Sequence, residues 1–129
     1  MRVILRNNQD PDDGRVYWSL TVGREYEVVS ISADHYRIVD DTGDPYIFEP
    51  ACFEVVDDNE PAFWKVSFGE GGERYANPPE WSEPGFFEDY HDRIESVRKQ
   101  FWEDHVRYYG EPRPPTKSRD HWRSYFDSQ

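Results

Sequence analysis

Short runs of alternating hydrophobic and polar residues fill the first half of the chain. After the turn at Gly23, the run 24–31 alternates between a strongly apolar face and a mixed one, as a half-buried strand does. The same reasoning predicts strands at 2–6, 36–39, 46–48, 54–56 and 63–68, with no helix before residue 60. Strands this short, separated by frequent turns, indicate a small β-barrel or sandwich.

The most strand-like region, residues 43–57, contains a proline and the only cysteine of the chain. Gly43 supplies the positive φ of a hairpin turn. Pro50 cannot donate to a strand ladder but fits the first position of a helix, so we predict a single helical turn over 50–53. This turn would redirect the chain across the open edge of a barrel. We interpret Cys52 as a small buried apolar residue beneath the turn rather than as a reactive thiol.

These residues resemble the Src-homology-3-like (SH3-like) barrel family over about residues 2–57. Leu20 and Gly23 are similar to its Leu-x-x-Gly diverging turn. The resemblance implies a barrel fold, but the Ala-Leu-Tyr-Asp-Tyr stretch and paired tryptophan of the peptide-binding members are missing, so their activity is not implied. The closing motif of the family is approximated, with one extra residue before the proline, by Gly43, Ile47, Pro50, Phe53 and Val55.

The second half of the chain follows a helical pattern. Residues 69–84 are predicted to be an extended linker whose Trp81 docks on the barrel. Residues 85–110 carry apolar side chains at spacings of three and four, which predicts one long amphipathic helix that ends at Gly110. Residues 111–129 are predicted to be a tail with a short helical turn. The expectation is therefore a single α+β domain over 1–129, with an SH3-like β-barrel at 1–68 and a long C-terminal helix packed on it.

Charge is the main functional clue in the composition. The chain has 27 acidic and 15 basic residues, a net charge of −12, and most of the excess lies in residues 1–60. The electrostatic field of this net charge repels nucleic-acid phosphates and attracts basic partners. The alternative is that the acidic surface only keeps the protein soluble. No apolar run approaches the roughly 20 residues of a membrane span. The first residues are too soon polar for a signal peptide, so we expect a cytoplasmic protein without nucleic-acid or membrane partners.

No sequence pattern points to catalysis or to a cofactor. The four histidines are scattered, without a His-x-x-x-His pair or a second cysteine, so we expect no metal site. The acidic loop 10–14 lacks the ligand spacing of a calcium loop. No nucleophile elbow or phosphate loop occurs. The expectation is a protein without catalytic residues, cofactor or metal, while an enzyme with an undetected carboxylate site stays an alternative.

Size, acidity and aromatic content favour a protein that binds another protein. The layout of barrel, aromatic linker and helix looks like that of small bacterial immunity proteins, which implies neutralisation of a basic toxin domain by direct binding. A non-catalytic module that recognises another protein or a peptide is the main alternative. Dense carboxylates would steer a cationic partner and tyrosines would anchor it. The candidate contacts are Asp10, Asp12, Asp13, Tyr36, Asp40, Asp41, Asp44, Tyr46, Asp57 and Asp58.

Overall fold

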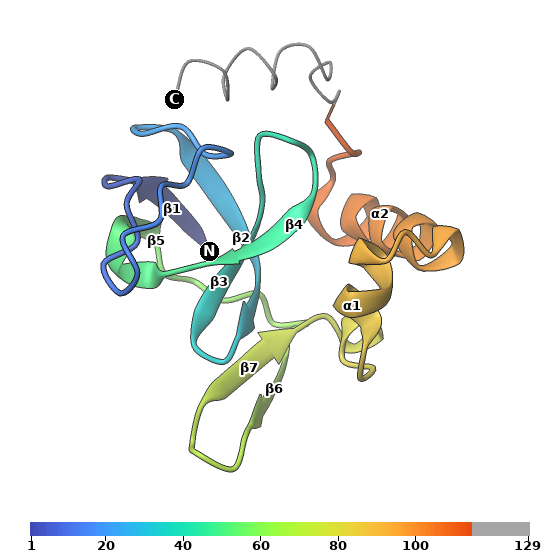
Figure 1. Cartoon of the computed structure of the whole chain (residues 1–129). Helices are drawn as coiled ribbons and strands as arrows, with labels where there is room; N and C mark the ends of the chain where they lie inside the picture. The colour runs from blue at the N-terminus through green and yellow to red at the C-terminus, as the bar shows by residue number, and fades with distance from the viewer. Residues whose placement is uncertain (115–129) are drawn as a thin grey trace.

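A computed structural model describes residues 1–114 of the chain. Strands dominate the first two thirds of this part, and two α-helices follow them (Figure 1). In chain order the elements are β1 (Arg2–Leu5), β2 (Glu25–Ser32), β3 (His35–Val39), β4 (Pro45–Phe48), the 3₁₀ turn η1 (Pro50–Cys52), β5 (Phe53–Asp57), β6 (Lys65–Phe68), β7 (Arg74–Asn77), the 3₁₀ turn η2 (Pro79–Trp81), α1 (Phe86–His91) and α2 (Glu95–Tyr109).

The strands form one antiparallel sheet that stays open. Its main path is β4-β3-β2-β1-β5, and β7 joins the far end of β2 through the pair Ile31 and Ala76 and carries β6 on its other side. Because β4 and β5 lie at opposite ends of this path and do not pair, the closed barrel that the sequence predicted is wrong.

Loop contacts, rather than pairing with β5, hold β4 and the turn that follows it. The ring of Tyr17, in the long loop between β1 and β2, packs edge-on against Phe48 with centroids 5.0 Å apart. The carbonyl of Cys52 accepts from the N–H groups of Arg6 and Asn7 at 2.9 and 3.1 Å. The turn η1 begins at Pro50, as predicted. Cys52, its last residue, is 1% exposed, which confirms the prediction that this side chain is buried.

Strand β2 is buried on both faces. Tyr26, Val28 and Ile31 belong to a first core cluster between the strands and the long loop, whereas Val29 belongs to a second cluster under the helices. Val28 and Val29 point to opposite faces of the strand, as neighbouring residues do. The register shift against β3 between Val28 and Ser30 returns Ile31 to the same core as Val28. One strand thus joins the sheet core to the helical core.

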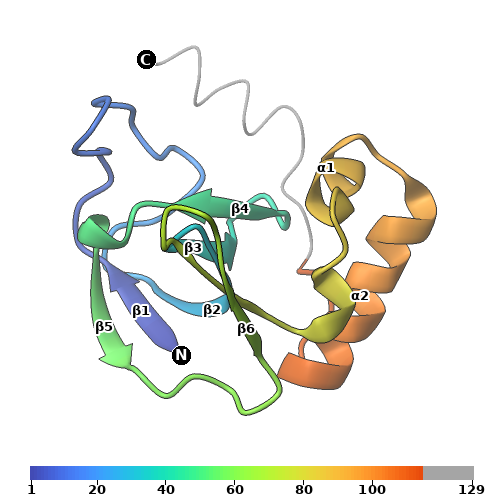
Figure 2. The same ribbon diagram turned by 90° about the horizontal axis from the view of Figure 1, so that it is seen from below.

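The second core is aromatic and covers one side of the sheet. Trp81, Phe86, Tyr90 and Phe101 are buried there, and Figure 2 shows α1 and α2 together, away from β1 and β5. Trp81 therefore docks as predicted. The stretch 69–84 is not simply an extended linker, because it forms β7 and η2.

The single long helix predicted at 85–110 is wrong, since the chain breaks between α1 and α2. Arg93 adopts φ 63°, a left-handed conformation that ends α1, and Ile94 precedes α2 with its side chain 45% exposed. The remaining helix has 15 residues and ends at Gly110 with φ 76°, as predicted. The predicted turn in the tail falls outside the described residues.

The β6–β7 hairpin extends beyond the body of the molecule (Figure 1). Alternation along the strand predicted at 63–68 puts Trp64, Val66 and Phe68 on one face. In the structure Trp64 is buried and its Nε1 donates to the hydroxyl of Tyr109, but Val66 and Phe68 are 45% and 68% exposed. The chain leaves the core immediately after Trp64.

Candidate functional site

A groove of about 270 Å³ lies between the long β1–β2 loop and strand β4. Its walls are mainly apolar: Val16 and Trp18 come from the loop, and Tyr46 and Ile47 come from β4. These four side chains are between 37% and 45% exposed, so together they form an accessible apolar surface on a charged protein.

The loop wall of this groove is fixed by Asp10 and Tyr17. The Tyr17 hydroxyl donates to the carboxylate of Asp10, which also accepts from the N–H groups of Asp12 and Asp13 at 2.8 and 3.3 Å. The hydrogen bond from Tyr17 holds the pKa of Asp10 below its usual value, and burial raises the pKa of Tyr17. The same hydroxyl accepts from the N–H of Glu49 at 3.3 Å, which ties the loop to the end of β4.

Strand β4 offers an unpaired backbone edge to the groove. At the start of the hairpin Asp40 donates its N–H to the carbonyl of Asp44, and Gly43, with φ 82°, donates to the carbonyl of Asp40. Residue pairs in an antiparallel ladder alternate between hydrogen-bonded and non-hydrogen-bonded. Counting from the bonded pair Asp40 and Asp44, Ile38 and Tyr46 form a hydrogen-bonded pair. Arg37 and Ile47 then form a non-hydrogen-bonded pair. The N–H and C=O of Ile47 therefore point away from β3.

The groove continues past Ile47 along α1, into a more open hollow of about 520 Å³. The ring of Tyr46 stacks on His91 with centroids 4.5 Å apart and planes 20° from parallel. Burial lowers the pKa of His91 below its ordinary value, so its imidazole is neutral at pH 7. The exposed carboxylates of Glu88 and Asp92 line this part and give it a negative rim.

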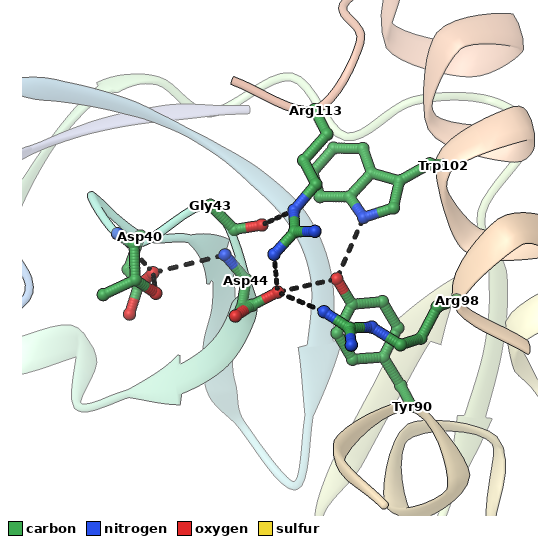
Figure 3. Close-up of polar contacts among 8 residues, drawn as sticks. Asp40, Gly43, Asp44, Tyr90, Arg98, Trp102 and Arg113 are labelled. Carbon is green, nitrogen blue, oxygen red and sulfur yellow. Dashed lines mark hydrogen bonds and ion pairs between the residues drawn. The ribbon is translucent and has the colours of Figure 1, made fainter. Parts of the chain in front are cut away.

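Asp44 connects the β3–β4 turn to both helices and to the segment after them (Figure 3). Its Oδ1 accepts from the hydroxyl of Tyr90 at 2.8 Å and from Nη2 of Arg113 at 3.0 Å, and Arg98 lies 3.6 Å away. Trp102 donates its Nε1 to the Tyr90 hydroxyl at 2.9 Å. Burial, with the hydrogen bond to Asp44, raises the pKa of Tyr90 to about 12. This network holds the helices against the β3–β4 hairpin.

Several of the predicted partner contacts are engaged within the chain. Asp41 accepts from Thr21 Oγ1 at 2.7 Å, Arg24 at 2.8 Å and the Tyr26 hydroxyl at 2.9 Å. Asp40 is 4% exposed and caps its own turn, and burial raises its pKa. Asp10 and Asp44 have the internal roles described above.

The other predicted contacts fall in separate places. Tyr36 packs edge-on against Phe53, with centroids 5.7 Å apart. Asp12 and Asp13 are exposed near the tip of the long loop that forms the groove wall. Asp57 and Asp58 are exposed at the end of β5, the strand farthest from β4 along the main path of the sheet. Of the ten residues, Tyr46 and the buried Asp40 line the groove, with the loop acids nearby in sequence. The roles of all ten stay predictions.

Sequence reasoning missed the apolar walls of the groove. Val16 and Trp18 follow a strongly polar loop, and Ile47 sits in a strand where either face could have been buried. A tryptophan next to such a loop was the one signal that could have indicated an exposed apolar surface.

Within residues 1–114, no three His, Cys, Asp or Glu side chains come together in a way that could hold a metal ion. In the same part of the chain, no helix has the length and apolar character needed to cross a membrane. Comparison of the chain with protein-family models, with curated proteins and with solved structures gave no match. The function is therefore argued from the geometry of the site.

Proposed function

We propose that this is a non-catalytic protein-binding protein whose groove along β4 receives an extended segment of a partner with basic side chains. Its specific role in this proposal is that of an immunity protein, which neutralises a basic bacterial toxin by direct binding. The observation that carries the proposal is the position of exposed Tyr46 and Ile47 on a strand edge beside the carboxylates of Glu88 and Asp92.

The free edge supports an extended partner segment. A strand edge can add a further strand, in which main-chain hydrogen bonds give affinity and alternate side chains give specificity. Ile47 supplies one outward N–H and C=O, while Pro45 has no N–H and its carbonyl accepts from His91. Pairing along β4 is thus limited to a short segment centred on Ile47, and side chains must supply the remaining affinity.

Side chains around Ile47 suit an apolar and basic segment. Trp18 and Tyr46 are of the aromatic types that usually anchor interfaces, and Val16 adds apolar surface beside them. Glu88 and Asp92 would meet a lysine or arginine of the partner, and the net charge of −12 would speed the encounter with a cationic domain.

The test is co-expression with the C-terminal domain of the larger protein encoded immediately upstream, provided that this domain is basic. We expect that domain alone to stop growth of the host, and co-expression of this protein to restore it. In vitro we expect a nanomolar complex whose association rate falls as salt is added. A salt-independent association rate would contradict the electrostatic part of the proposal.

Two variants with equal exposure locate the interface. Ile47→Lys places a charge in the groove, whereas Val66→Lys changes a side chain of the same 45% exposure on β6, away from it. We expect Ile47→Lys to weaken the complex at least about tenfold and Val66→Lys to leave it unchanged. Binding without any toxic activity would support a protein-recognition module and refute the immunity role. Equal effects of the two variants would refute the groove.

A further inference from the structure

Arg37 of β3 lies between the hollow along α1 and a second cleft on its other side, and it lines both. Its guanidinium stacks on the ring of Phe87, with the central carbon 3.6 Å from the ring centroid. The side chain is partly buried, and burial lowers its pKa to about 10, so it still carries a full positive charge at pH 7. The stacking contact fixes the plane of the cation and leaves its edges available.

The hydrogen-bonding capacity of Arg37 is mostly unused. Its Nε donates to Ser30 Oγ at 3.2 Å, but neither Nη1 nor Nη2 has an acceptor among residues 1–114, and no carboxylate in that part lies at ion-pair distance. Arginine carries five N–H donors, so four remain. Seven other arginines in the described chain pair with carboxylates: Arg2, Arg6, Arg24, Arg74, Arg98, Arg107 and Arg113.

The two other described arginines without a carboxylate partner, Arg15 and Arg93, are exposed, so water solvates them. Arg37 differs because it is partly withdrawn from water. A cation in that position is costly unless an anion or hydrogen-bond acceptors compensate for it. In a chain with 27 acidic residues, it is a specific feature of this position that no carboxylate among residues 1–114 pairs with the guanidinium, although Glu83 and Glu88 line the same cleft.

The second cleft has a volume of about 370 Å³ and a polar lining. It lies between the end of β2, the β6–β7 hairpin and the start of α1. Besides Arg37, the residues Ser32, Ser67 and Tyr75 line it, and each carries a hydroxyl group that can donate a hydrogen bond. The lining therefore combines one planar cation with several neutral donors.

We propose that this cleft binds a carboxylate group, which pairs with the free Nη edge of Arg37 while the hydroxyl groups around it donate to the remaining lone pairs. The fork of a guanidinium matches a carboxylate with two parallel hydrogen bonds. Glu83 and Glu88 also line the cleft. Their charges repel a phosphate, which carries nearly two charges at pH 7, more than they repel a singly charged carboxylate.

The test follows the side-chain Nε–H signals of arginine by NMR in the ¹⁵N-labelled full chain. Sodium acetate is titrated at pH 7 against sodium chloride of equal ionic strength. We expect a saturable shift of the Arg37 signal with acetate and none with chloride. Backbone amide signals of the cleft residues Ser32 and Tyr75 should shift together with it. These amide shifts should disappear in Arg37→Gln and persist in Arg15→Gln, which removes an exposed arginine outside the cleft. Backbone spectra of both variants establish that they fold.

Further ligands define the chemistry and the source of the carboxylate. Arg37→Lys keeps the charge but not the fork, so we expect acetate, followed by the backbone amide signals of Ser32 and Tyr75, to bind roughly tenfold more weakly. A short peptide with a free C-terminus, compared with its C-terminal amide, distinguishes a chain terminus from a small free acid. A tighter response to inorganic phosphate than to acetate would overturn the carboxylate assignment. No saturable response to any of these anions would overturn the site itself.

Discussion

Replacing Phe101 by alanine should remove a large part of the stability of the protein. The side chain is 0% exposed at the centre of the second core, where its ring lies 4.5 Å from Trp81, 4.9 Å from Trp102 and 5.3 Å from Tyr90, centroid to centroid. Phe→Ala at such a position costs about 3–5 kcal/mol, because buried area is lost and the neighbours cannot fill the cavity. Domains of this kind have about 5–15 kcal/mol in total.

Urea unfolding followed by tryptophan fluorescence measures this loss, and Trp81 and Trp102 report directly on the cavity. With a slope of about 2 kcal/mol per molar urea, the midpoint should fall by roughly 1.5–2.5 M. Val106→Ala on the same helix is the control, because Val106 is 46% exposed and its loss should change stability by less than about 0.5 kcal/mol. A loss below about 1 kcal/mol for Phe101→Ala, or separate transitions for sheet and helices, would refute the packing described here.

Three further predictions follow from single contacts. Tyr90→Phe removes a buried hydroxyl that joins Asp44 to Trp102 and should cost about 1–3 kcal/mol in urea unfolding. Tyr108→Phe, at a half-buried hydroxyl that bonds the carboxylate of Glu80, should cost less, and equal losses would contradict the bridging role. Arg93→Gly relieves the strain of a left-handed backbone and should stabilise the protein by about 0.5–1 kcal/mol, despite the added freedom of the unfolded chain. A loss of stability would mean that the side chain of Arg93 contributes more than its backbone costs. Burial lowers the pKa of His105 below 6.5 in the folded state, so the unfolded chain takes up the proton first as the pH falls. The free energy of unfolding should therefore decrease as the pH drops through 6.5, by at most about 1.4 kcal/mol per pH unit. The decline should be shallower in His105→Gln, and identical slopes between pH 7.5 and 5.5 would contradict it.

The strands β1 to β5 could be predicted because alternation and turn chemistry act locally. The turn at Gly43, the helical start at Pro50 and the helix end at Gly110 each depend on the backbone preference of one residue. Closure of the barrel depends instead on whether two distant strands meet. Here β4 and β5 do not pair, and Phe48 of β4 instead contacts Tyr17 of the long loop, which no local pattern indicates.

The break at Arg93 escaped prediction for a similar reason. The apolar spacing runs without interruption through Ile94, and neither glycine nor proline marks the break. Tertiary packing of Tyr90 and Phe101 around Trp81 sets the angle between the helices, and Arg93 accepts a costly φ to satisfy it.

The candidate site was predictable only in its composition. Asp12 and Asp41 look alike in sequence, since both lie in acidic turns next to another aspartate. Only the folded chain shows that Asp41 receives three hydrogen bonds while Asp12 remains exposed. An acidic residue that serves the fold cannot be separated from one that serves a partner by charge patterning alone.

The position of β2 between the two cores also has a kinetic consequence. Solvent can reach the amides at its centre only after the helices have left one face and the long loop has left the other. Hydrogen–deuterium exchange of Val28 and Val29 should therefore proceed only through global unfolding, whereas the β6–β7 hairpin, joined to β2 by one residue pair, should exchange through local opening.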